Sequence, residues 1–349
     1  MYRNSNWWVN VFIKWITRYH MSENNRVCII GGTGFLGYHA LVEFIDHGWE
    51  TTVIGLPSSE RSLNFPPEVK VILKDIETLT DYDLLALMRG HTALIYAAGM
   101  DDRSIPHKPA YPKFFHENVE NPIRVLKLAR EAGVKRAVIF GSYFVHFDRL
   151  WPEMKLAQHH PYIRSRVEQE KAVLSLAGMD VDVLELPYVF GSLPIDGWKP
   201  LWLPLIKYLY RSPIILFTPG GAACVSARTV AAAAYKTIVN GRAGNCYPIN
   251  QENLTWEQLL NSLTRVRGLR KRVISLPKWI VEICMYSISI LHYLQGKEGG
   301  LDPRYFTGLQ TANTFVDPSP SQNRLGYEMK DLDEAFRDTV EACGFKKGD

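Results

Sequence analysis

Short apolar runs alternate with longer amphipathic stretches along the first half of the chain. The apolar runs are rich in Val, Ile and Leu and predict β-strands at residues 26–30, 50–54, 69–73, 92–96, 136–139 and 181–185. Most of them are continuous, which is typical of strands covered on both faces of a parallel sheet. Helices are predicted between them, most clearly over 34–47, 113–132 and 162–177. This order predicts an α/β protein built on a Rossmann-type, doubly wound parallel sheet.

The pattern changes after about residue 191. Five prolines between Pro194 and Pro219 divide a stretch dense in aromatic residues into short pieces. Further helices are predicted over 226–240, 255–267, 277–295 and 332–341, and we expect the first of these to return to the sheet. We therefore divide the chain into an N-terminal extension (1–25), a sheet-forming domain (26–190) and a smaller, mainly helical C-terminal region (191–349) that binds substrate.

Composition narrows the class of protein. The 349 residues include 40 basic and 36 acidic residues, a formal net charge of +4, with no run of like charge. This distribution argues against a nucleic-acid partner. The five cysteines are odd in number and far apart, and none forms a C-x-x-C pair. We therefore expect neither a disulfide framework nor a metal site, and a reducing cytoplasm as the location.

Two segments bear on the membrane. Residues 1–20 are aromatic and basic. Their apolar stretch is too short to span a bilayer and is interrupted by Lys14. Two interpretations stay open: a segment that touches the membrane surface, or a true start at Met21. The second segment, residues 279–294, carries Glu282 and His292 and is predicted as a buried or surface helix rather than a span.

A glycine motif stands between the first predicted strand and the first predicted helix. Gly31, Gly34 and Gly37 are three residues apart in RVCIIGGTGFLG. In a strand–turn–helix unit the first glycine permits the tight turn, the second lets the backbone approach a pyrophosphate, and the third lets helix and strand pack closely. The helix N-terminus then offers free N–H groups to phosphate. The motif predicts a dinucleotide-binding site in residues 26–190.

This G-x-x-G-x-x-G spacing resembles the short-chain dehydrogenase/reductases, and GGTGFLG resembles their extended branch, the NAD-dependent epimerase/dehydratase superfamily. The resemblance runs from about residue 26 to 343 and is nearest to flavonol-reductase-like and hydroxysteroid-dehydrogenase-like members. It implies nicotinamide dinucleotide as the cofactor. It also implies cofactor contacts at the glycine turn and at four later segments: Gly31, Thr33, Gly34, Phe35, Leu36, Gly37; Asp75, Ile76; Ala97, Ala98, Gly99; Asn118; Pro187 and Val189.

The choice between NAD and NADP depends on the end of the second strand. NAD-selective sites usually place an acidic residue there, which accepts hydrogen bonds from the ribose hydroxyls. This chain has Gly55 at that position, and Arg61 follows closely. An arginine can pair with a 2′-phosphate, so NADP is favoured, with NAD left open.

The family's Ser, Tyr and Lys have counterparts here with one substitution. Ser142 follows the fifth strand, and Tyr162 begins the next helix as the expected proton donor or acceptor. Four residues on, Arg166 stands where the family has lysine. Its charge lies on the same helix face and is expected to lower the pKa of Tyr162, but an arginine cannot relay a proton. His146, His159 and His160 are alternative proton donors, although surface or loop positions are favoured for them. Asp101 and Asp102 follow the fourth strand and could face the substrate, although a solvated loop is favoured.

Three functions follow from these observations. The first is an NAD(P)-dependent oxidoreductase acting on a small hydrophobic carbonyl or secondary alcohol. The aromatic stretch 192–217 agrees with this function if part of it lines the pocket. The second is a sugar-nucleotide epimerase or dehydratase. The third is a non-catalytic dinucleotide-binding subunit or redox sensor, because of Arg166. The expected partner is the small substrate, and a homodimer and membrane contact through residues 1–20 are left open.

Overall fold

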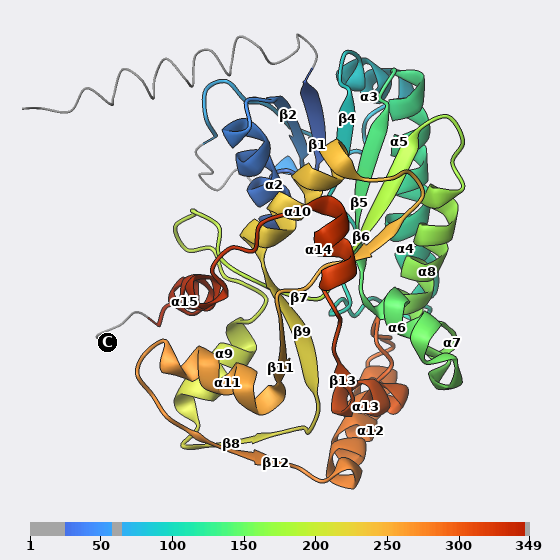
Figure 1. The fold of residues 1–349 in the computed structure, drawn as a ribbon. Coiled ribbons are helices and arrows are strands. Elements are labelled where there is room, and N and C mark those ends of the chain that lie inside the picture. The colour runs from blue at the N-terminus through green and yellow to red at the C-terminus, as the bar shows by residue number, and fades with distance from the viewer. Residues whose placement is uncertain (1–24, 58–64, 346–349) are drawn as a thin grey trace, which may run out of the picture.

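The computed structural model describes residues 25–57 and 65–345, so the predicted extension up to residue 24 and Arg61 lie outside the described residues. Its centre is a seven-stranded sheet in the order β10-β6-β5-β4-β1-β2-β3, in which every pairing is parallel (Figure 1). The strands are β1 (Arg26–Ile30), β2 (Glu50–Gly55), β3 (Lys70–Leu73), β4 (Ala93–Tyr96), β5 (Arg136–Ser142), β6 (Asp180–Leu186) and β10 (Cys246–Pro248). The predicted doubly wound parallel sheet is therefore confirmed.

Alternate residues of the strands face two separate cores. Val27 and Ile29 of β1 pack with α2 (Phe35–Asp46) and α10 (Ala227–Asn240) on one face. Cys28 and Ile30 pack on the other face, which is covered by α3 (Asp81–Met88), α5 (Asn121–Glu131) and the C-terminal part of α8 (Pro161–Leu174). Burial on both faces explains why these strands are continuous apolar runs. The predicted helix 226–240 lies beside α2, against the sheet.

The helix predicted over 113–132 is divided into three parts. It consists of α4 (Tyr111–Phe115), one π-helical turn, η2 (His116–Glu120), and α5. Pro122 has no N–H group and cannot donate to the carbonyl four residues earlier, so the regular ladder cannot continue there. Instead the N–H of Asn121 donates to the carbonyl of His116, five residues back. Such π turns often occur at functional sites, and this one carries Asn118.

The C-terminal region holds six helices besides α10, together with two small sheets that the sequence pattern does not predict. The helices are α9 (Leu203–Arg211), α11 (Trp256–Arg265), α12 (Lys278–Leu294), α13 (Pro303–Thr311), α14 (Ser319–Leu325) and α15 (Leu332–Ala342). One sheet pairs β9 (Gly221–Ser226) with β7 (Tyr188–Phe190), β11 (Glu252–Thr255) and β13 (Asn313–Thr314). The other pairs β8 (Ile214–Phe217) with β12 (Arg272–Ser275).

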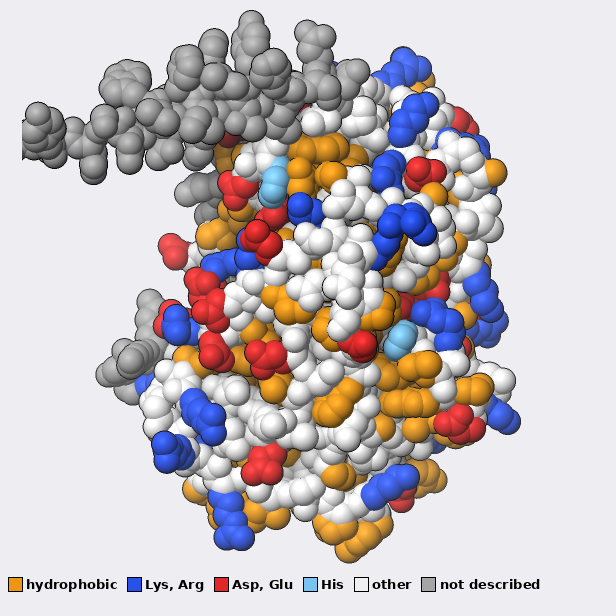
Figure 2. Space-filling model, in the orientation of Figure 1, with side chains coloured by type: hydrophobic (Ala, Val, Ile, Leu, Met, Phe, Trp, Pro, Cys, Tyr) orange, Lys and Arg blue, Asp and Glu red, His pale blue; other side chains and the backbone are white. Residues whose placement is uncertain are grey.

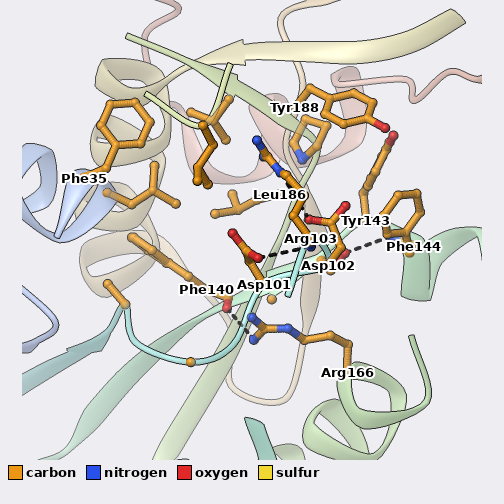
Figure 3. Close-up of a pocket in the computed structure, with 18 of the residues that line it drawn as sticks. Phe35, Asp101, Asp102, Arg103, Phe140, Tyr143, Phe144, Arg166, Leu186 and Tyr188 are labelled. Carbon is orange, nitrogen blue, oxygen red and sulfur yellow. Dashed lines mark hydrogen bonds and ion pairs between the residues drawn. The ribbon is translucent and has the colours of Figure 1, made fainter. Parts of the chain in front are cut away.

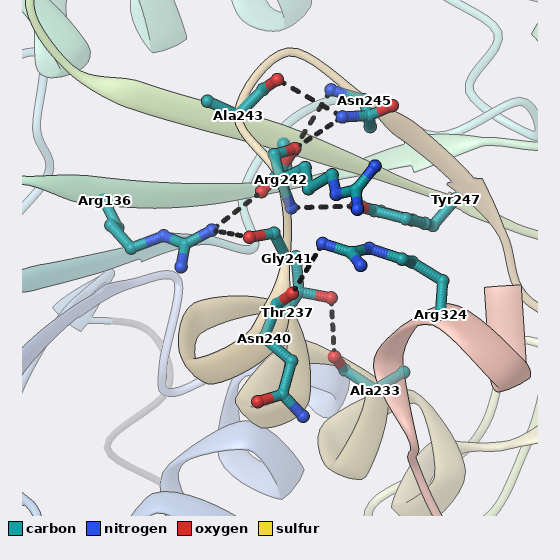
Figure 4. Close-up of polar contacts among 11 residues, drawn as sticks. Arg136, Ala233, Thr237, Asn240, Gly241, Arg242, Ala243, Asn245, Tyr247 and Arg324 are labelled. Atoms are coloured by element: carbon teal, nitrogen blue, oxygen red, sulfur yellow. Dashed lines mark hydrogen bonds and ion pairs between the residues drawn. The ribbon is translucent and has the colours of Figure 1, made fainter.

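The end of α10 is fastened to the sheet by side chains from three other elements (Figure 4). Arg136 of β5 donates to the carbonyl of Gly241 at 2.7 Å, and Arg324 of α14 donates to that of Asn240 at 3.5 Å. The hydroxyl of Tyr247 in β10 accepts from the N–H of Arg242 at 3.0 Å. The first two bonds satisfy carbonyl groups that a helix end leaves without partners, and the bond from Arg136 joins the C-terminal region to the central sheet.

Among the described residues, no helix is both long and apolar enough to cross a bilayer. The predicted segment 279–294 forms most of α12, in which Val281 is the only buried residue. It is therefore a surface helix, and the alternative of a buried helix is wrong.

Candidate active site

Two cavities lie at the carboxyl ends of the central strands, which is where open parallel sheets bind their ligands. One of about 380 Å³ borders the ends of β1, β2 and β3, and the other, of about 320 Å³, borders the ends of β5 and β6. Ala97, Ala98 and Gly99, which follow β4, line both cavities. The two cavities therefore meet at this segment and form one elongated site.

The glycine turn between β1 and α2 has no room for side chains. Gly31 has a φ of +79°, and a Cβ there would lie 2.7 Å from the carbonyl oxygen of Ala97. A Cβ on Gly37 would lie 2.2 Å from the carbonyl oxygen of Gly31. Both distances are shorter than real contacts allow. The first glycine thus sets the turn and the third sets the close packing of α2 against it, as the motif predicts.

Gly34 is the residue before α2, and it offers that helix no side-chain cap. The first N–H groups of α2 therefore remain available to an anion at the positive end of the helix dipole. Thr33, Phe35 and Leu36 border the same space from either side. A pyrophosphate fits this turn, because its glycines present no side chains and the N-terminus of α2 follows them.

The larger cavity is suited to the adenosine half of a dinucleotide. Asp75 and Ile76 line it, together with Ala97, Ala98 and Gly99. Lys74 lines it as well, a residue that the sequence analysis did not select. At the end of β2, a Cβ on Gly55 would lie 2.1 Å from the hydroxyl oxygen of Thr33. The Thr33 side chain thus occupies the place where an acidic residue would begin.

Asn118 is fully buried beneath the junction of the two cavities. Its Oδ1 accepts from the N–H of Met100 at 2.8 Å, and its Nδ2 donates to the carbonyl of Met100 at 3.1 Å. The same Nδ2 group donates to the hydroxyl of Ser165 in α8 at 3.0 Å. Asn118 therefore fixes the loop after β4 against α8.

Ser142, Tyr162 and Arg166 line the smaller cavity together, as the sequence analysis expects. Ser142 is the last residue of β5, and Tyr162 lies in the first turn of α8. The main chain of Tyr162 is held by the carbonyl of Gly300 at 3.0 Å. The guanidinium carbon of Arg166 lies 5.3 Å from the centre of the Tyr162 ring. Pro187 and Val189 border the same cavity from the segment after β6.

Arg166 is held by three acceptors. Its Nη1 donates to Gln169 Oε1 at 2.9 Å and to the carbonyl of Phe140 at 3.3 Å, and its Nη2 donates to the carbonyl of Met100 at 3.4 Å. Figure 3 shows the guanidinium turned toward the floor of the cavity, beside Phe140. The cation is thus fixed in place beneath the site rather than free to move within it.

Burial dominates the acid–base properties of Tyr162. It raises the pKa of this phenol above its usual value of 10, and the charge of Arg166 acts against that rise without overcoming it. Ser142 also lowers the pKa and Asp102 raises it. The prediction of a lowered pKa is therefore wrong for the protein alone, because it counted the cation and not the loss of water around the ring.

Charged residues of the loop after β4 also line this cavity. They are Asp101, Asp102 and Arg103, and Figure 3 shows them on the same side of the site as Tyr188. Trp198 and Trp202 line the cavity as well. The side chain of Asp102 is only 17% exposed, and burial raises its pKa. The expectation of a solvated loop is thus wrong for Asp102. The other interpretation, that Asp102 faces the substrate, rests on its position after a parallel strand, where ligand-binding residues gather.

The three alternative histidines have other partners. His146 lies 3.7 Å from Glu185, and the ring of His159 stacks on Tyr305. His160 Nδ1 accepts from the N–H of Asp302 at 2.9 Å. The residues that line the smaller cavity include none of the three histidines, whereas Tyr162 and Ser142 both line it.

Comparison with known proteins agrees with this geometry. Residues 27–196 match the NAD dependent epimerase/dehydratase family. The predicted resemblance to the extended short-chain dehydrogenase/reductases is confirmed. The site is thus of the kind found in NAD-dependent oxidoreductases and epimerases, whose substrates differ from member to member.

Three similar proteins illustrate that range. A candidate dihydroflavonol 4-reductase of Synechocystis sp. is 22% identical over 338 residues, which cover 89% of this chain and 92% of that protein. The mouse (Mus musculus) sterol-4-alpha-carboxylate 3-dehydrogenase, decarboxylating, is 24% identical over 163 residues, 44% of this chain and 42% of that one. The crystal structure of gox2253 has a TM-score of 0.74 at 18% identity, covering 91% of this chain and 98% of that one. This last likeness concerns the fold alone.

Proposed function

We propose that this protein is an NADP(H)-dependent oxidoreductase that transfers a hydride between the nicotinamide and a small hydrophobic carbonyl or secondary alcohol. One observation carries the proposal. Ser142, Tyr162 and Arg166 line a single cavity that has an aromatic wall and that meets the dinucleotide cradle at Gly99. Small-molecule sites are mostly apolar with a few placed polar groups, and this cavity has that character.

The chain's own residues would handle the proton and the substrate oxygen. The bound cofactor supplies or accepts the hydride. In reduction, Tyr162 Oη donates its proton to the carbonyl oxygen while Ser142 Oγ holds that oxygen by a hydrogen bond. The raised pKa of Tyr162 keeps this proton in place near neutral pH, which suits reduction better than oxidation. Arg166 steadies the negative charge that develops on the tyrosine oxygen.

The preference for NADP is supported by the adenosine cavity. Gly55 provides no carboxylate to repel a 2′-phosphate, and Thr33 fills the space above it. Lys74 brings a cation to the same cavity. Arg61, which the sequence pattern suggests for this role, lies outside the described residues, so Lys74 is the described cation that supports the proposal.

A second function, cofactor binding without hydride transfer, is favoured by a specific observation. Arg166 replaces the usual lysine and is held by Gln169, Phe140 and Met100, so it cannot pass a proton outward. We therefore expect the two functions to be separated by kinetics. Oxidation of NADPH is followed at its absorbance band with a panel of hydrophobic ketones, while binding is followed by nicotinamide fluorescence. Binding with steady turnover supports the oxidoreductase, and binding without turnover on any ketone or alcohol of the panel overturns it.

A further inference from the structure

Helix α12 presents an unusual surface. Of its 17 residues only Val281 is buried, and six large apolar side chains are more than half exposed: Trp279, Ile283, Tyr286, Leu291, Tyr293 and Leu294. At 100° per residue, most of these lie on the side of the helix opposite Val281. A helix on the surface of a globular protein normally turns its apolar stripe inward. This helix turns one outward, and contiguous exposed apolar surface of this kind marks an interaction site.

The apolar surface continues beyond the helix. Ile214 and Leu216 of β8 are each about half exposed, at 48% and 49%. Strand β8 pairs with β12, which leads into α12 after two residues, so the three elements share the lower edge of the molecule in Figure 1. Figure 2 shows hydrophobic side chains gathered along this edge, with Lys and Arg side chains beside them.

The segment around α12 carries a net positive charge. Residues 265–304 contain eight basic and three acidic residues, a net charge of +5, whereas the whole chain carries only +4. All three acidic side chains are engaged by the protein itself. Glu282 lies 3.9 Å from Lys278, Asp302 lies 2.6 Å from Arg304, and Glu298 accepts from the N–H of Ala110. Lys278 and Arg304 are the basic partners in two of these contacts, and the segment as a whole keeps its net positive charge.

An apolar stripe within a basic surface fits an anionic lipid surface. Trp and Tyr favour the boundary between headgroups and acyl chains, because one end of each ring is apolar and the other is polar. Lysines beside such a stripe can keep their stems on apolar surface and their charge in water. The ammonium of Lys108 lies 5.9 Å from the centre of the Tyr293 ring, at the edge of this stripe. A second copy of the chain fits less well, because a two-fold contact would bring two surfaces of the same positive charge together.

We propose that the face formed by α12 and β8 lies on an anionic membrane surface, with α12 parallel to the bilayer plane. Monotopic helices of this kind combine apolar burial with attraction to anionic lipid. The segment that follows α12 leads directly to the active site. The N–H of Gly300 donates to the carbonyl of Ser104, and the carbonyl of Gly300 accepts from the N–H of Tyr162. The catalytic cavity and the lipid-facing helix are therefore joined by one short, hydrogen-bonded segment.

The first test measures binding of the full chain to vesicles. Sedimentation is compared for phosphatidylcholine alone and for phosphatidylcholine with about 30% phosphatidylglycerol. The parent is expected to bind the anionic vesicles. The triple variant Ile283→Glu, Tyr286→Glu, Leu294→Glu is expected to bind at least roughly tenfold more weakly, because three apolar contacts become anionic. Tyr82→Glu is the matched control, since Tyr82 is 75% exposed on α3 at another edge, and it should bind like the parent.

A second measurement uses the parent chain, so it does not depend on whether the triple variant folds. Of the chain's five cysteines, all in the described part, Cys284 alone is exposed, and it lies on α12. An environment-sensitive fluorophore attached there should shift its emission to the blue when anionic vesicles are added. The proposal is overturned if the label does not respond, or if the triple variant binds as the parent does. It is also overturned if sedimentation in solution shows a parent dimer that the triple variant dissociates. None of these outcomes depends on turnover, so they are distinct from a failure of the proposed function.

Discussion

The guanidinium of Arg166 and the side-chain amide of Asn118 donate to the same acceptor, the main-chain carbonyl of Met100. The Nη2–O distance is 3.4 Å and the Nδ2–O distance is 3.1 Å. One residue comes from α8 and the other from the π turn, so two elements converge on the loop that joins the cavities. Arg166 therefore places a charge beneath Tyr162 and also supports the loop that joins the two cavities.

These two roles predict different results for two replacements of Arg166. Arg166→Lys keeps the charge near Tyr162, and we expect turnover equal to or higher than that of the parent. Arg166→Met removes the charge and leaves acceptors at Phe140, Met100 and Gln169 without their donor. We expect turnover to fall by about 10- to 100-fold and the apparent pKa for alcohol oxidation to rise. Steady-state kinetics across pH measures both effects. Equal turnover and equal pH profiles in the parent and Arg166→Met would show that the guanidinium does not act on the tyrosine.

Removal of the phenol tests the proton donor itself. Tyr162→Phe should lower turnover by about 10²- to 10⁴-fold, the usual contribution of general acid catalysis, and leave the cofactor dissociation constant unchanged. Tyr143→Phe is the matched control, because Tyr143 also lines the cavity but its hydroxyl contacts Thr314 at 3.2 Å. If the two variants lose turnover equally, or if Tyr162→Phe retains it, another group transfers the proton.

The central sheet could be predicted from the sequence because its strands are buried on both faces. The strand predicted at 26–30 has those bounds in the structure, and the others differ mainly at their ends. The strand at 136–139 extends to Ser142 through a glycine and a serine, which an apolar pattern does not mark. Strand β9, with the sequence GAACVS, was missed for a related reason. Small residues carry little strand preference, and its pairing with β7, β11 and β13 comes from segments distant in the chain.

The site was predictable only where a residue type is tied to a local motif. The glycine turn and the Tyr162–Arg166 spacing are local, and the structure brings both to the cavities. Asp102 shares its cavity with Trp202, which lies about a hundred residues later in the chain. No local pattern reports such a contact. The pKa of Tyr162 was mispredicted for the same reason, because burial is a property of the assembled fold.

The stability of the protein should fall in mild acid through His160. Burial lowers its pKa to about 4, from an ordinary value of 6.5. Between these values the unfolded chain binds a proton that the folded protein excludes. The stabilisation is thus present above pH 6.5 and is lost as the pH falls toward 4, by up to about 3 kcal/mol. Urea unfolding at neutral pH and near the lower value measures this loss.

A matched pair of variants isolates the contribution of His160. His160→Asn keeps an acceptor for the N–H of Asp302 and should reduce the loss of stability in acid. His159→Asn changes a neighbouring ring that stacks on Tyr305, and it should leave the acid dependence as in the parent. If the free energy of unfolding falls equally with pH in the parent and in His160→Asn, the acid sensitivity belongs to other groups, among them the partly buried His39.

Cofactor choice should depend on Lys74. Lys74→Ala is expected to weaken NADPH binding by roughly tenfold and NADH binding by less than about twofold, because only the former carries a 2′-phosphate for the ammonium to meet. Lys70→Ala is the control, since Lys70 begins the same strand region and lies outside the residues that line the adenosine cavity. Titration by nicotinamide fluorescence gives both dissociation constants. If Lys74→Ala weakens the binding of the two cofactors equally, Lys74 contacts a group that both of them carry and not the 2′-phosphate.

The glycine turn gives a test that needs no substrate. A methyl group on Gly37 would lie 2.2 Å from the carbonyl oxygen of Gly31, so in Gly37→Ala either α2 or the turn must move. We expect a loss of about 1–3 kcal/mol in the free energy of unfolding and cofactor binding weakened by at least tenfold. Gly308→Ala is the control. Gly308 lies on helix α13, and the new methyl group would meet only Met154, at 4.0 Å. That variant should be unchanged or more stable by up to about 1 kcal/mol, since alanine favours the helix. If Gly37→Ala binds NADPH and unfolds like Gly308→Ala, the close packing of α2 on the turn is not what shapes the phosphate cradle.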